Sequence, residues 1–471
     1  MRPDVRVEDL RARSKLALSD GFLRGAVSFT VDRLRNAKSR STEALGSWDE
    51  WREQGREIRA HTLANLDYYL ERFATQASAA GAQVHFAKTV AEARAALLGI
   101  ARSNGARRVV KSKSMLSEEL GVNEALERAG IQVVETDLGE WIVQLAEETP
   151  SHLILPAIHK QRAQIQQLFE AQAEAPLAPD TATLAGFARE RLRREFEQAD
   201  LGITGCNFAV AETGSVALFT NEGNGRMVTT LPRTHVVLMG MERIVPSLDD
   251  LEVMANLLPL SATGQKLTTY VNLLTGPRRR DEQDGPRELH VMVVDGGRAA
   301  VLADEEFRDV LSCIRCGACL NVCPVYRHVG GHAYGSVYSG PIGAVLSPLL
   351  DPNGAISELA NASTLCGACF DACPVKIPLH DRLVQLRRRN AERRDGGAEA
   401  LAFRAYARLF SSARWFGLLG RVARALQRLL GRQRSERWAR SLPGIGAWLR
   451  YRTLPKAPSR AFRDSFEERG H

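Results

Sequence analysis

Seven of the eight cysteines in this 471-residue chain lie between Cys313 and Cys373, in two short runs. The first run is Cys313-Ile-Arg-Cys316-Gly-Ala-Cys319-Leu-Asn-Val-Cys323-Pro, with the spacing C-x₂-C-x₂-C-x₃-C-P. Bacterial ferredoxins bind iron–sulfur clusters with this spacing, because one short loop can place three thiolates on three corners of a cubane. A loop committed to such a cluster has little conformational freedom left, so this run constrains the fold around it.

The second run, Cys366-Gly-Ala-Cys369-Phe-Asp-Ala-Cys373-Pro, has the same spacing but lacks a first cysteine, and Ser363 stands in its place. In two-cluster ferredoxins the last cysteine of each run binds the other cluster. We therefore expect one cluster to be held by Cys313, Cys316, Cys319 and Cys373. The second cluster is expected on Cys323, Cys366 and Cys369.

Two [4Fe–4S] clusters need more thiolates than the two runs supply. The second cluster is then [3Fe–4S], or [4Fe–4S] with an oxygen ligand such as Ser363 or water, or [4Fe–4S] with a distant thiol. Cys206 is the remaining thiol, and a lone cysteine among Gly and apolar residues more often packs as a small hydrophobe. Zinc sites also use C-x₂-C pairs, but they do not require the C-x₃-C-P ending in both halves.

Sequence texture divides the chain into four segments: 1–80, 81–297, 304–394 and 395–471. Segment 1–80 is expected to be a helical arm, since Leu63, Leu66, Leu70 and Phe73 recur at helical spacing. Segment 304–394 carries the cysteines and predicts an all-α, two-cluster ferredoxin-type domain. The last segment is rich in Arg, Ala and Leu and predicts a helical basic tail.

In segment 81–297, short β-rich runs alternate with amphipathic helices, which predicts an α/β domain. Helices are expected over 90–103, 118–129 and 180–199, the last with Asp180 as its N-cap. The strands are expected at Gln83–Ala87, Arg108–Lys111, Gln132–Glu135, His152–Leu155, Phe208–Ala211, Ser215–Thr220, His235–Met239 and His290–Asp295.

Two polar loops of this domain are candidates for an anion or substrate site. The first consists of Lys111, Ser112, Lys113 and Ser114 at a strand-to-helix junction, and the second contributes Glu212, Thr213, Asn221, Glu222, Asn224 and Arg226. Successive N–H groups and cations at a helix start can hold a carboxylate or a phosphate. The Asn-Glu-Gly-Asn-Gly stretch fits a simple turn equally well, because turns use these residues to reach positive φ.

The chain has no stretch near the ~20 apolar residues of a membrane span, and its first residues lack the apolar core of a signal peptide. With thiols committed to metal, these features fit the reducing cytoplasm.

The formal net charge of +8 is concentrated in the tail, where Trp415–Arg432 predicts a basic amphipathic helix. Such a helix can lie on the inner face of the membrane, dock an acidic partner, or expose a solvated Arg face. Nucleic-acid binding is not expected, because no recognised binding motif accompanies the charge.

The segments Lys111-Ser-Lys-Ser, Glu212-Thr-Gly-Ser and Thr220-Asn-Glu-Gly-Asn-Gly-Arg226, followed by the cysteine runs, together resemble the lactate-utilisation protein B family. That family is the iron–sulfur subunit of a three-protein L-lactate oxidation system. The resemblance covers almost the whole chain and implies an α/β domain similar to the sugar-phosphate isomerase and CoA-transferase class. It also implies two companion proteins, one cysteine-rich and one sharing the α/β domain. The family's second run is also one cysteine short, and the family offers no catalytic residue to transfer.

Three functions are compatible with these features. The leading hypothesis is an electron relay through two clusters during oxidation of L-lactate to pyruvate, as a non-autonomous subunit of a dehydrogenase complex. The second is an autonomous oxidoreductase acting on another small hydroxy acid. No flavin or nicotinamide motif supports it, and clusters pass single electrons whereas lactate oxidation releases two. The third is a non-enzymatic iron–sulfur sensor or scaffold.

Overall fold

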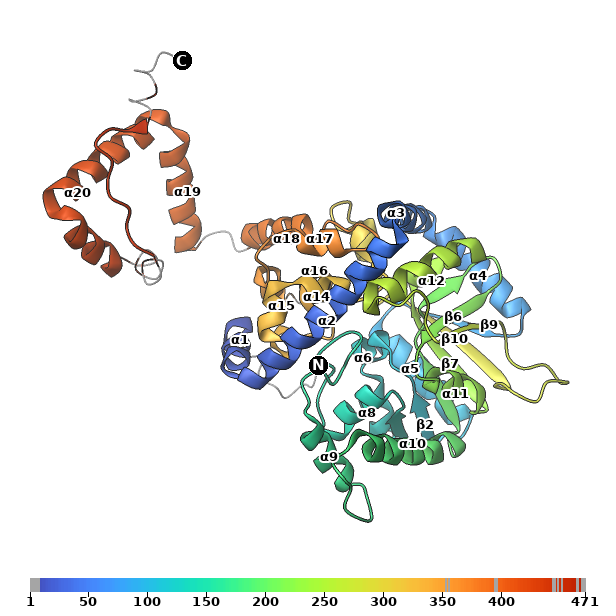
Figure 1. Cartoon of the computed structure of the whole chain (residues 1–471). Helices are drawn as coiled ribbons and strands as arrows, with labels where there is room; N and C mark the ends of the chain where they lie inside the picture. The colour runs from blue at the N-terminus through green and yellow to red at the C-terminus, as the bar shows by residue number, and fades with distance from the viewer. Residues whose placement is uncertain are drawn as a thin grey trace. The chain divides into compact units, whose positions relative to one another are not determined.

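The computed structural model describes residues 9–351, 354, 356–393, 397–442, 446, 449, 452–462 and 466. The chain divides into two compact units, Met1–Arg389 and Asn390–His471. The first unit holds an N-terminal arm, an α/β domain and the cysteine-bearing domain, and the second holds two long helices (Figure 1).

The N-terminal arm consists of α1 (Leu10–Ser19), α2 (Gly21–Leu45), α3 (Trp48–Ala64) and α4 (Leu66–Ala79). Aspartate side chains begin the first two helices: Asp9 accepts the N–H of Ala12, and Asp20 accepts the N–H of Leu23. Helix α2 lies across the cysteine-bearing domain (Figure 1), where it contacts α14 (Ala318–Val322) and α15 (Pro324–Val329). Val31 of α2 is fully buried in this contact.

The α/β domain is built on a six-stranded sheet with the order β1-β10-β7-β4-β2-β3, in which every neighbouring pair is parallel. Its strands are β1 (Gln83–Ala87), β2 (Arg108–Lys111), β3 (Gln132–Glu135), β4 (Leu201–Thr204), β7 (Thr234–Gly240) and β10 (Glu288–Val294). Val236 and Val237, which face opposite sides of β7, are both fully buried. Burial of both faces is typical of a parallel sheet covered by helices.

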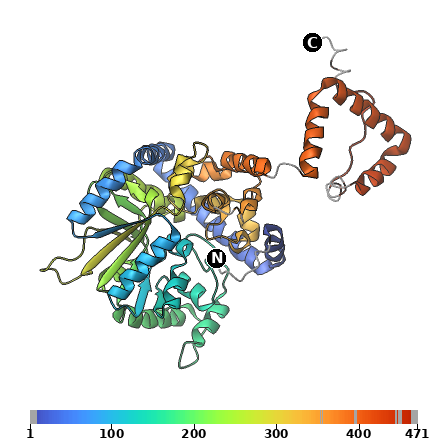
Figure 2. The same cartoon turned by 180° about the vertical axis from the view of Figure 1, so that it is seen from behind.

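Helices cover both faces of this sheet (Figure 2). On one face, Leu97 of α5 packs with Val236, and on the other, Val110 of β2 packs with Trp141 of α8. On the second face the arm also contributes Phe73 of α4, which packs in one cluster with Val237. The helices of this domain are α5 (Val90–Ser103), α6 (Met115–Leu120), α7 (Val122–Arg128), α8 (Leu138–Leu145), α9 (Arg162–Glu170), α10 (Thr181–Glu197), α11 (Asn224–Thr230), α12 (Leu248–Thr263) and α13 (Arg298–Ala303).

A smaller mixed sheet has the order β8-β5-β6-β9. Its strands are β5 (Phe208–Val210), β6 (Ser215–Thr220), β8 (Ile244–Val245) and β9 (Tyr270–Leu274). The β5–β6 hairpin turns at Gly214, whose φ is +68° and whose added Cβ would lie 2.2 Å from the backbone nitrogen of Ala77. Only glycine fits there, so the hairpin can rest directly on helix α4.

The cysteine-bearing domain is a set of short helices. They are η2 (Arg308–Ser312), α14, α15, η3 (His332–Tyr334), α16 (Gly340–Leu350), η4 (Ser357–Asn361), α17 (Ala368–Ala372) and α18 (Leu379–Arg393). Their core is continuous with the arm and the α/β domain, since Val31, Leu257 and Leu320 belong to one cluster of buried side chains. The domain is thus positioned against the α/β domain by shared apolar packing.

The second unit contains α19 (Ala398–Ser411) and α20 (Ala413–Ser441). Helix α20 is interrupted at Gly431, which has non-helical backbone angles. The Ser412 side chain begins α20 by accepting the N–H of Trp415. The basic helix expected at Trp415–Arg432 lies within α20. Among the described residues, no helix has the length and apolar character needed to span a bilayer.

Most strands expected from the sequence are present with the same bounds or small shifts, but the strand expected at His152–Leu155 is wrong. That segment is a loop, because Nδ1 of His152 accepts the N–H groups of Ile154 (3.0 Å) and Leu155 (3.2 Å). The helix expected over 118–129 is divided into α6 and α7 at Gly121, which has a φ of +58°.

Strands β4, β8 and β9 are not predicted by the sequence pattern. The interior of β4 contains Gly202, which usually argues against a strand. Here an added Cβ on Gly202 would lie 2.3 Å from the carbonyl oxygen of Val228 in α11. Glycine therefore allows the helix to approach the sheet closely at this point.

Candidate functional site

The two cysteine runs fold into the same loop twice. In each loop the residues on both sides of one cysteine have positive φ: Arg315 (60°) and Gly317 (74°) in the first, Leu365 (57°) and Gly367 (82°) in the second. Each loop then enters a short helix, α14 or α17, which ends at the last cysteine of its run. Positive φ costs a non-glycine residue roughly 1–2 kcal/mol, so Arg315 and Leu365 hold backbone that the surrounding contacts must stabilise.

Four cysteines line one small cavity between the two loops: Cys313, Cys316, Cys319 and Cys373. This is the set that the spacing assigns to the first cluster. The backbone N–H of Arg315 donates to Sγ of Cys313 at 3.4 Å, and that of Ile377 donates to Sγ of Cys373 at 3.4 Å. Apolar side chains form most of the other walls. N–H donors and apolar walls around thiolates are what an iron–sulfur cluster requires of its protein, so these residues fit one.

The other three cysteines of the runs lie close enough for their charges to interact: beyond the effect of burial, Cys366 raises the pKa of Cys323, and both of these thiols raise the pKa of Cys369. Cys323 and Cys369 are buried, whereas Cys366 is exposed. The N–H of Ala368 lowers the pKa of the Cys366 thiol, while burial raises the pKa of Cys369 to about 12. The second set therefore opens toward solvent.

Ser363 occupies the corner of the second loop that Cys313 occupies in the first. Its Oγ accepts the N–H of Leu365 at 3.1 Å, and its carbonyl oxygen accepts a hydrogen bond from Nη2 of Arg387 at 3.0 Å. Cys206, the distant thiol considered as a fourth ligand, packs in the α/β domain with a different core cluster from the one that holds six of the seven cysteines. Of the two side chains, Ser363 is the one placed at the second set.

Within the described ranges, no three His, Cys, Asp or Glu side chains converge as a mononuclear metal site would require. A cubane does not require such convergence, because each thiolate binds a different iron.

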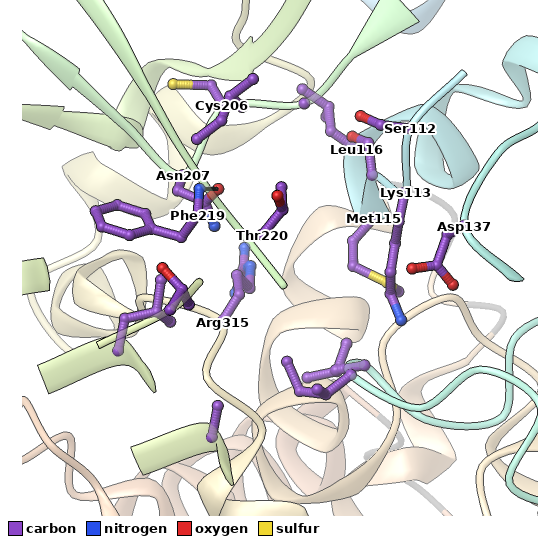
Figure 3. Close-up of a pocket in the computed structure, with 18 of the residues that line it drawn as sticks. Ser112, Lys113, Met115, Leu116, Asp137, Cys206, Asn207, Phe219, Thr220 and Arg315 are labelled. Carbon is purple, nitrogen blue, oxygen red and sulfur yellow. Dashed lines mark hydrogen bonds between the residues drawn. The ribbon is translucent and has the colours of Figure 1, made fainter. Parts of the chain in front are cut away.

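A pocket of about 250 Å³ lies beside the first cysteine set, at the carboxyl ends of β2, β4 and β7. The loops that follow these strands supply Lys113, Asn207 and Arg243, and Arg315 reaches the pocket from the first cysteine loop. Figure 3 shows the guanidinium of Arg315 directed toward Asn207 and Thr220. Crevices at the carboxyl ends of parallel strands are the usual ligand sites of such sheets.

One wall of the pocket is an ion cluster around Glu242, which is 1% exposed. Its carboxylate lies 2.9 Å from Nε of Arg298, 3.5 Å from Nη2 of Arg315 and 3.9 Å from Nε of Arg243. Burial alone raises the pKa of Glu242, but the arginines outweigh burial and bring it down to about 2. Arg298 also makes two 2.8 Å hydrogen bonds to Glu119. The carboxylates are thus shared among more arginines than they can neutralise.

The pocket brings together only part of the two polar loops predicted from the sequence. It is lined by Ser112, Lys113, Ser114, Asn221, Glu222 and Asn224. Lys111 is buried and forms ion pairs with Glu118 (2.8 Å) and Glu135 (2.7 Å), so it supports the loop from behind. Glu212 accepts the N–H of Leu248, Thr213 donates to Ser215, and Arg226 is exposed on α11. These four side chains do not line the pocket.

The sequence pattern does not reveal the charged wall, which consists of Glu242, Arg243, Arg298 and Arg315. Three of them follow strands β7 and β10, and nothing local distinguishes them from surface charges. Arg315 does carry a signal, because it stands inside the first cysteine run where the repeat has Leu365.

Three family models match consecutive parts of the chain. The LUD domain matches residues 70–294, the 4Fe-4S dicluster domain matches residues 309–377, and the model described as lactate utilisation protein B, C-terminal, matches residues 384–471. An α/β domain with a parallel sheet is therefore followed by a 4Fe-4S dicluster domain and a helical C-terminal region.

Curated relatives match along their whole length. The chain is 48% identical over 465 residues to lactate utilization protein B of Macrococcus caseolyticus, covering 98% of this chain and 97% of the relative. It is 46% identical over 473 residues to the protein of the same name from Bacillus subtilis, covering 100% and 98%. A crystal structure of a DUF162 family protein from Deinococcus radiodurans matches 49% of this chain and 98% of that chain, with 19% identity and a TM-score of 0.29. That likeness is too low to bear on the fold.

Proposed function

The chain belongs to the lactate utilization protein B family, and on that premise we propose that it relays electrons during oxidation of L-lactate to pyruvate. The observation that carries the proposal is the repeated loop, which places four cysteines around one cavity and three more beside it. Bound clusters would supply one-electron transfer. Cys313, Cys316, Cys319 and Cys373 would hold the first. Cys323, Cys366 and Cys369 would hold the second, with Ser363 or water at its fourth corner.

We infer the path of the electrons from where the two cysteine sets lie. The first set shares Arg315 and Leu153 with the walls of the α/β pocket, and the second set reaches the surface at Cys366. Electrons would thus enter on the pocket side and leave near Cys366, where a partner can dock. Pairing of single electrons requires another redox group, so we assign that step to the companion proteins of the system, one cysteine-rich and one sharing the α/β domain.

Complementation tests this proposal in a bacterium that lacks its own copy of the gene and has no other L-lactate dehydrogenase. The wild-type chain should restore growth on L-lactate, whereas Cys319→Ser and Cys369→Ser should not, with protein levels checked by immunoblot. Arg308→Leu is a matched control, because it removes a half-exposed cation of the same domain and should grow like the wild type. Normal growth of both cysteine variants would rule out the relay.

The pocket beside the first cysteine set favours a second candidate, an autonomous oxidoreductase acting on a small hydroxy acid. It predicts that the purified, cluster-loaded protein reduces a one-electron dye with L-lactate or another hydroxy acid. If dye reduction requires the companion proteins, the relay is the better description.

We also propose that the α/β domain is of the sugar-phosphate isomerase and CoA-transferase kind. Support comes from the all-parallel sheet and from the pocket at the carboxyl ends of its strands. A crystal structure of the chain, compared with members of that class, would test this.

The second unit suggests where the relay works. Its helices expose large apolar side chains among arginines, for example Leu401 (70%) and Leu429 (82%). We propose that this unit lies on an anionic membrane surface, which such helices bind through apolar contact and charge. The full chain should float with anionic vesicles but not with zwitterionic ones, and Arg421→Glu with Arg424→Glu should abolish flotation. Equal recovery from both kinds of vesicle would contradict it.

A further inference from the structure

Several buried polar atoms on the pocket walls have no hydrogen-bond partner among the described residues. They are Nε and Nη1 of Arg315, Oγ1 of Thr220, and Nζ of Lys113, which has an ion pair with Glu140 at 3.6 Å but no hydrogen bond. The Arg315 side chain is only 8% exposed, and its guanidinium stacks 4.6 Å from the ring centroid of Tyr338, which fixes its plane. Buried donors without partners are rare in folded proteins and point to a bound molecule that completes them.

The charge of the pocket indicates what that molecule carries. Four cations (Lys113, Arg243, Arg298 and Arg315) and three carboxylates (Asp137, Glu222 and Glu242) line it. Behind the lining, Glu119 pairs with Arg298, Arg59 adds a cation, and Glu140 lies 3.6 Å from Lys113 with its pKa raised by burial to about 8. With Glu140 protonated at neutral pH, five cations face four carboxylates, which leaves one net positive charge. Arg59 lies behind this wall, where it is 1% exposed and donates to backbone carbonyls of residues 242, 244 and 311. A monoanion balances this excess, whereas a dianion would exceed the charge of the lining.

The geometry of the donors narrows the ligand further. A guanidinium offers two parallel N–H groups that match a carboxylate, and Nε and Nη1 of Arg315 are free to do so. Arg243 lies next to Arg315, and burial together with that neighbouring charge lowers the pKa of Arg243. An anion between the two guanidiniums would relieve their repulsion.

Thr220 and Asn207 lie across the pocket from Arg315 (Figure 3). Oδ1 of Asn207 is engaged by the N–H of Phe219 at 3.0 Å, and its Nδ2 donates no hydrogen bond within the described part of the chain. Together the two side chains offer a hydroxyl and an amide to a second polar group of the ligand.

We propose that this pocket binds a small monocarboxylate with a hydroxyl or keto oxygen on the adjacent carbon. The carboxylate lies on Arg315 and Arg243, and the adjacent oxygen lies near Thr220 and Asn207. The choice of a hydroxy or keto acid rests on the proposed function. The presence of a carboxylate site rests on the pocket alone.

Arg315 also connects this site to the first cysteine set. Its backbone N–H donates to Sγ of Cys313, while its side chain lines the pocket. Neutralising a cation beside a cluster lowers the cluster's reduction potential, since net charge is one of its determinants. By linkage, the carboxylate then binds more tightly to the oxidised protein than to the reduced protein.

Calorimetric titration of the full-length, cluster-loaded protein under anaerobic conditions tests binding. Pyruvate and L-lactate should bind, acetate should bind more weakly, and inorganic phosphate should not compete. Arg315→Leu should weaken pyruvate binding by about tenfold or more, the usual effect of losing a charge-assisted hydrogen bond. The backbone tolerates leucine there, because Leu365 adopts the same φ in the repeat.

Further variants separate the roles of the side chains. Arg243→Gln should weaken the binding of every carboxylate. Because it lies outside the cysteine loop, it replaces Arg315→Leu as the test if that variant does not load its clusters. Thr220→Val should weaken the binding of pyruvate and L-lactate while leaving the binding of acetate unchanged. Arg308→Leu should bind like the wild type. The proposal would be overturned if both Arg315→Leu and Arg243→Gln bound pyruvate as tightly as the wild type, or if the pocket preferred phosphate.

A redox titration followed by EPR supplies a second readout. Saturating pyruvate should lower the potential of the first cluster in the wild type and leave it unchanged in Arg315→Leu. An unchanged potential in the wild type would remove the link through Arg315. Failure of the chain to pass electrons between a reductant and a dye would defeat the relay without affecting the binding result, so the two proposals fail separately.

Discussion

Ser363 and Cys313 occupy equivalent corners of two copies of one loop. Sγ of Cys313 accepts the N–H of the residue two positions later at 3.4 Å, and Oγ of Ser363 does the same at 3.1 Å. The backbone is therefore already shaped for a cysteine at position 363. At this corner the two loops differ in one atom, not in the path of the chain.

Restoring that sulfur should change the second cluster. In Ser363→Cys we expect the EPR signal of an oxidised three-iron cluster to disappear and the iron content to rise by about one atom per chain, because a fourth thiolate completes a [4Fe–4S] site. Iron analysis and EPR of anaerobically purified protein measure both. Thr364→Cys is the matched control, since it adds a thiol next to the corner and should change neither. A wild type without a three-iron signal would show that oxygen already completes the site.

The last cysteine of each run is expected to bind the cluster of the other run, and this can be tested by substitution. Cys373→Ser should remove the EPR signal of the first cluster, although Cys373 belongs to the second run, because it lines the cavity with Cys313, Cys316 and Cys319. Cys323→Ser should instead affect the second cluster. Spectra of both variants, each recorded beside the wild type, decide the matter. The opposite pattern would mean that each run binds its own cluster.

Glu242→Gln should destabilise the protein strongly. The change leaves three arginines, of which Arg298 and Arg315 are buried, without their shared carboxylate, and breaking a buried ion pair costs about 3–5 kcal/mol. The midpoint of urea unfolding, followed by tryptophan fluorescence, should fall accordingly. Glu305→Gln removes a carboxylate that is 91% exposed and lies 3.7 Å from Arg308. It should therefore change the free energy of unfolding by less than about 0.5 kcal/mol. Similar shifts in both variants would contradict a role for burial.

Stability should depend on pH through His152. Burial lowers the pKa of His152 to about 4, and its Nδ1 accepts two backbone N–H groups, so the folded protein holds it neutral. The unfolded chain takes up that proton near its ordinary pKa of about 6.5, so the stabilisation is present above that pH and is lost as the pH falls toward 4.

From pH 7 to pH 5 we expect a loss of about 2 kcal/mol from this group. His152→Asn, which can still accept a backbone N–H but does not titrate, should flatten the curve of urea midpoint against pH. A curve as steep as that of the wild type would assign the dependence to other groups.

The sequence predicted what depends on neighbouring residues. Spacing alone grouped Cys373 with the first run and placed β1, β2 and β3, because ligand loops and buried β-branched runs are local patterns. It did not reveal the charged wall, since Arg243, Arg298 and Arg315 come from three distant segments that meet only in the folded chain. The segment His152–Leu155 shows the opposite error. Its apolar run predicts a strand, but the His152 side chain accepts hydrogen bonds from the backbone of the next residues and holds the segment as a loop.

The packing of the arm has a consequence for synthesis on the ribosome. Asp32 of α2 pairs with Arg327 of α15, 295 residues later, and Val31 is buried in the same contact. At about 5–20 residues per second, the apolar side of α2 waits on the order of 15 to 60 s for its partner to emerge. During that interval the apolar side of α2 is exposed surface of the kind that chaperones protect. The cysteine-bearing domain, made after the arm and the α/β domain, supplies the partner that covers the arm.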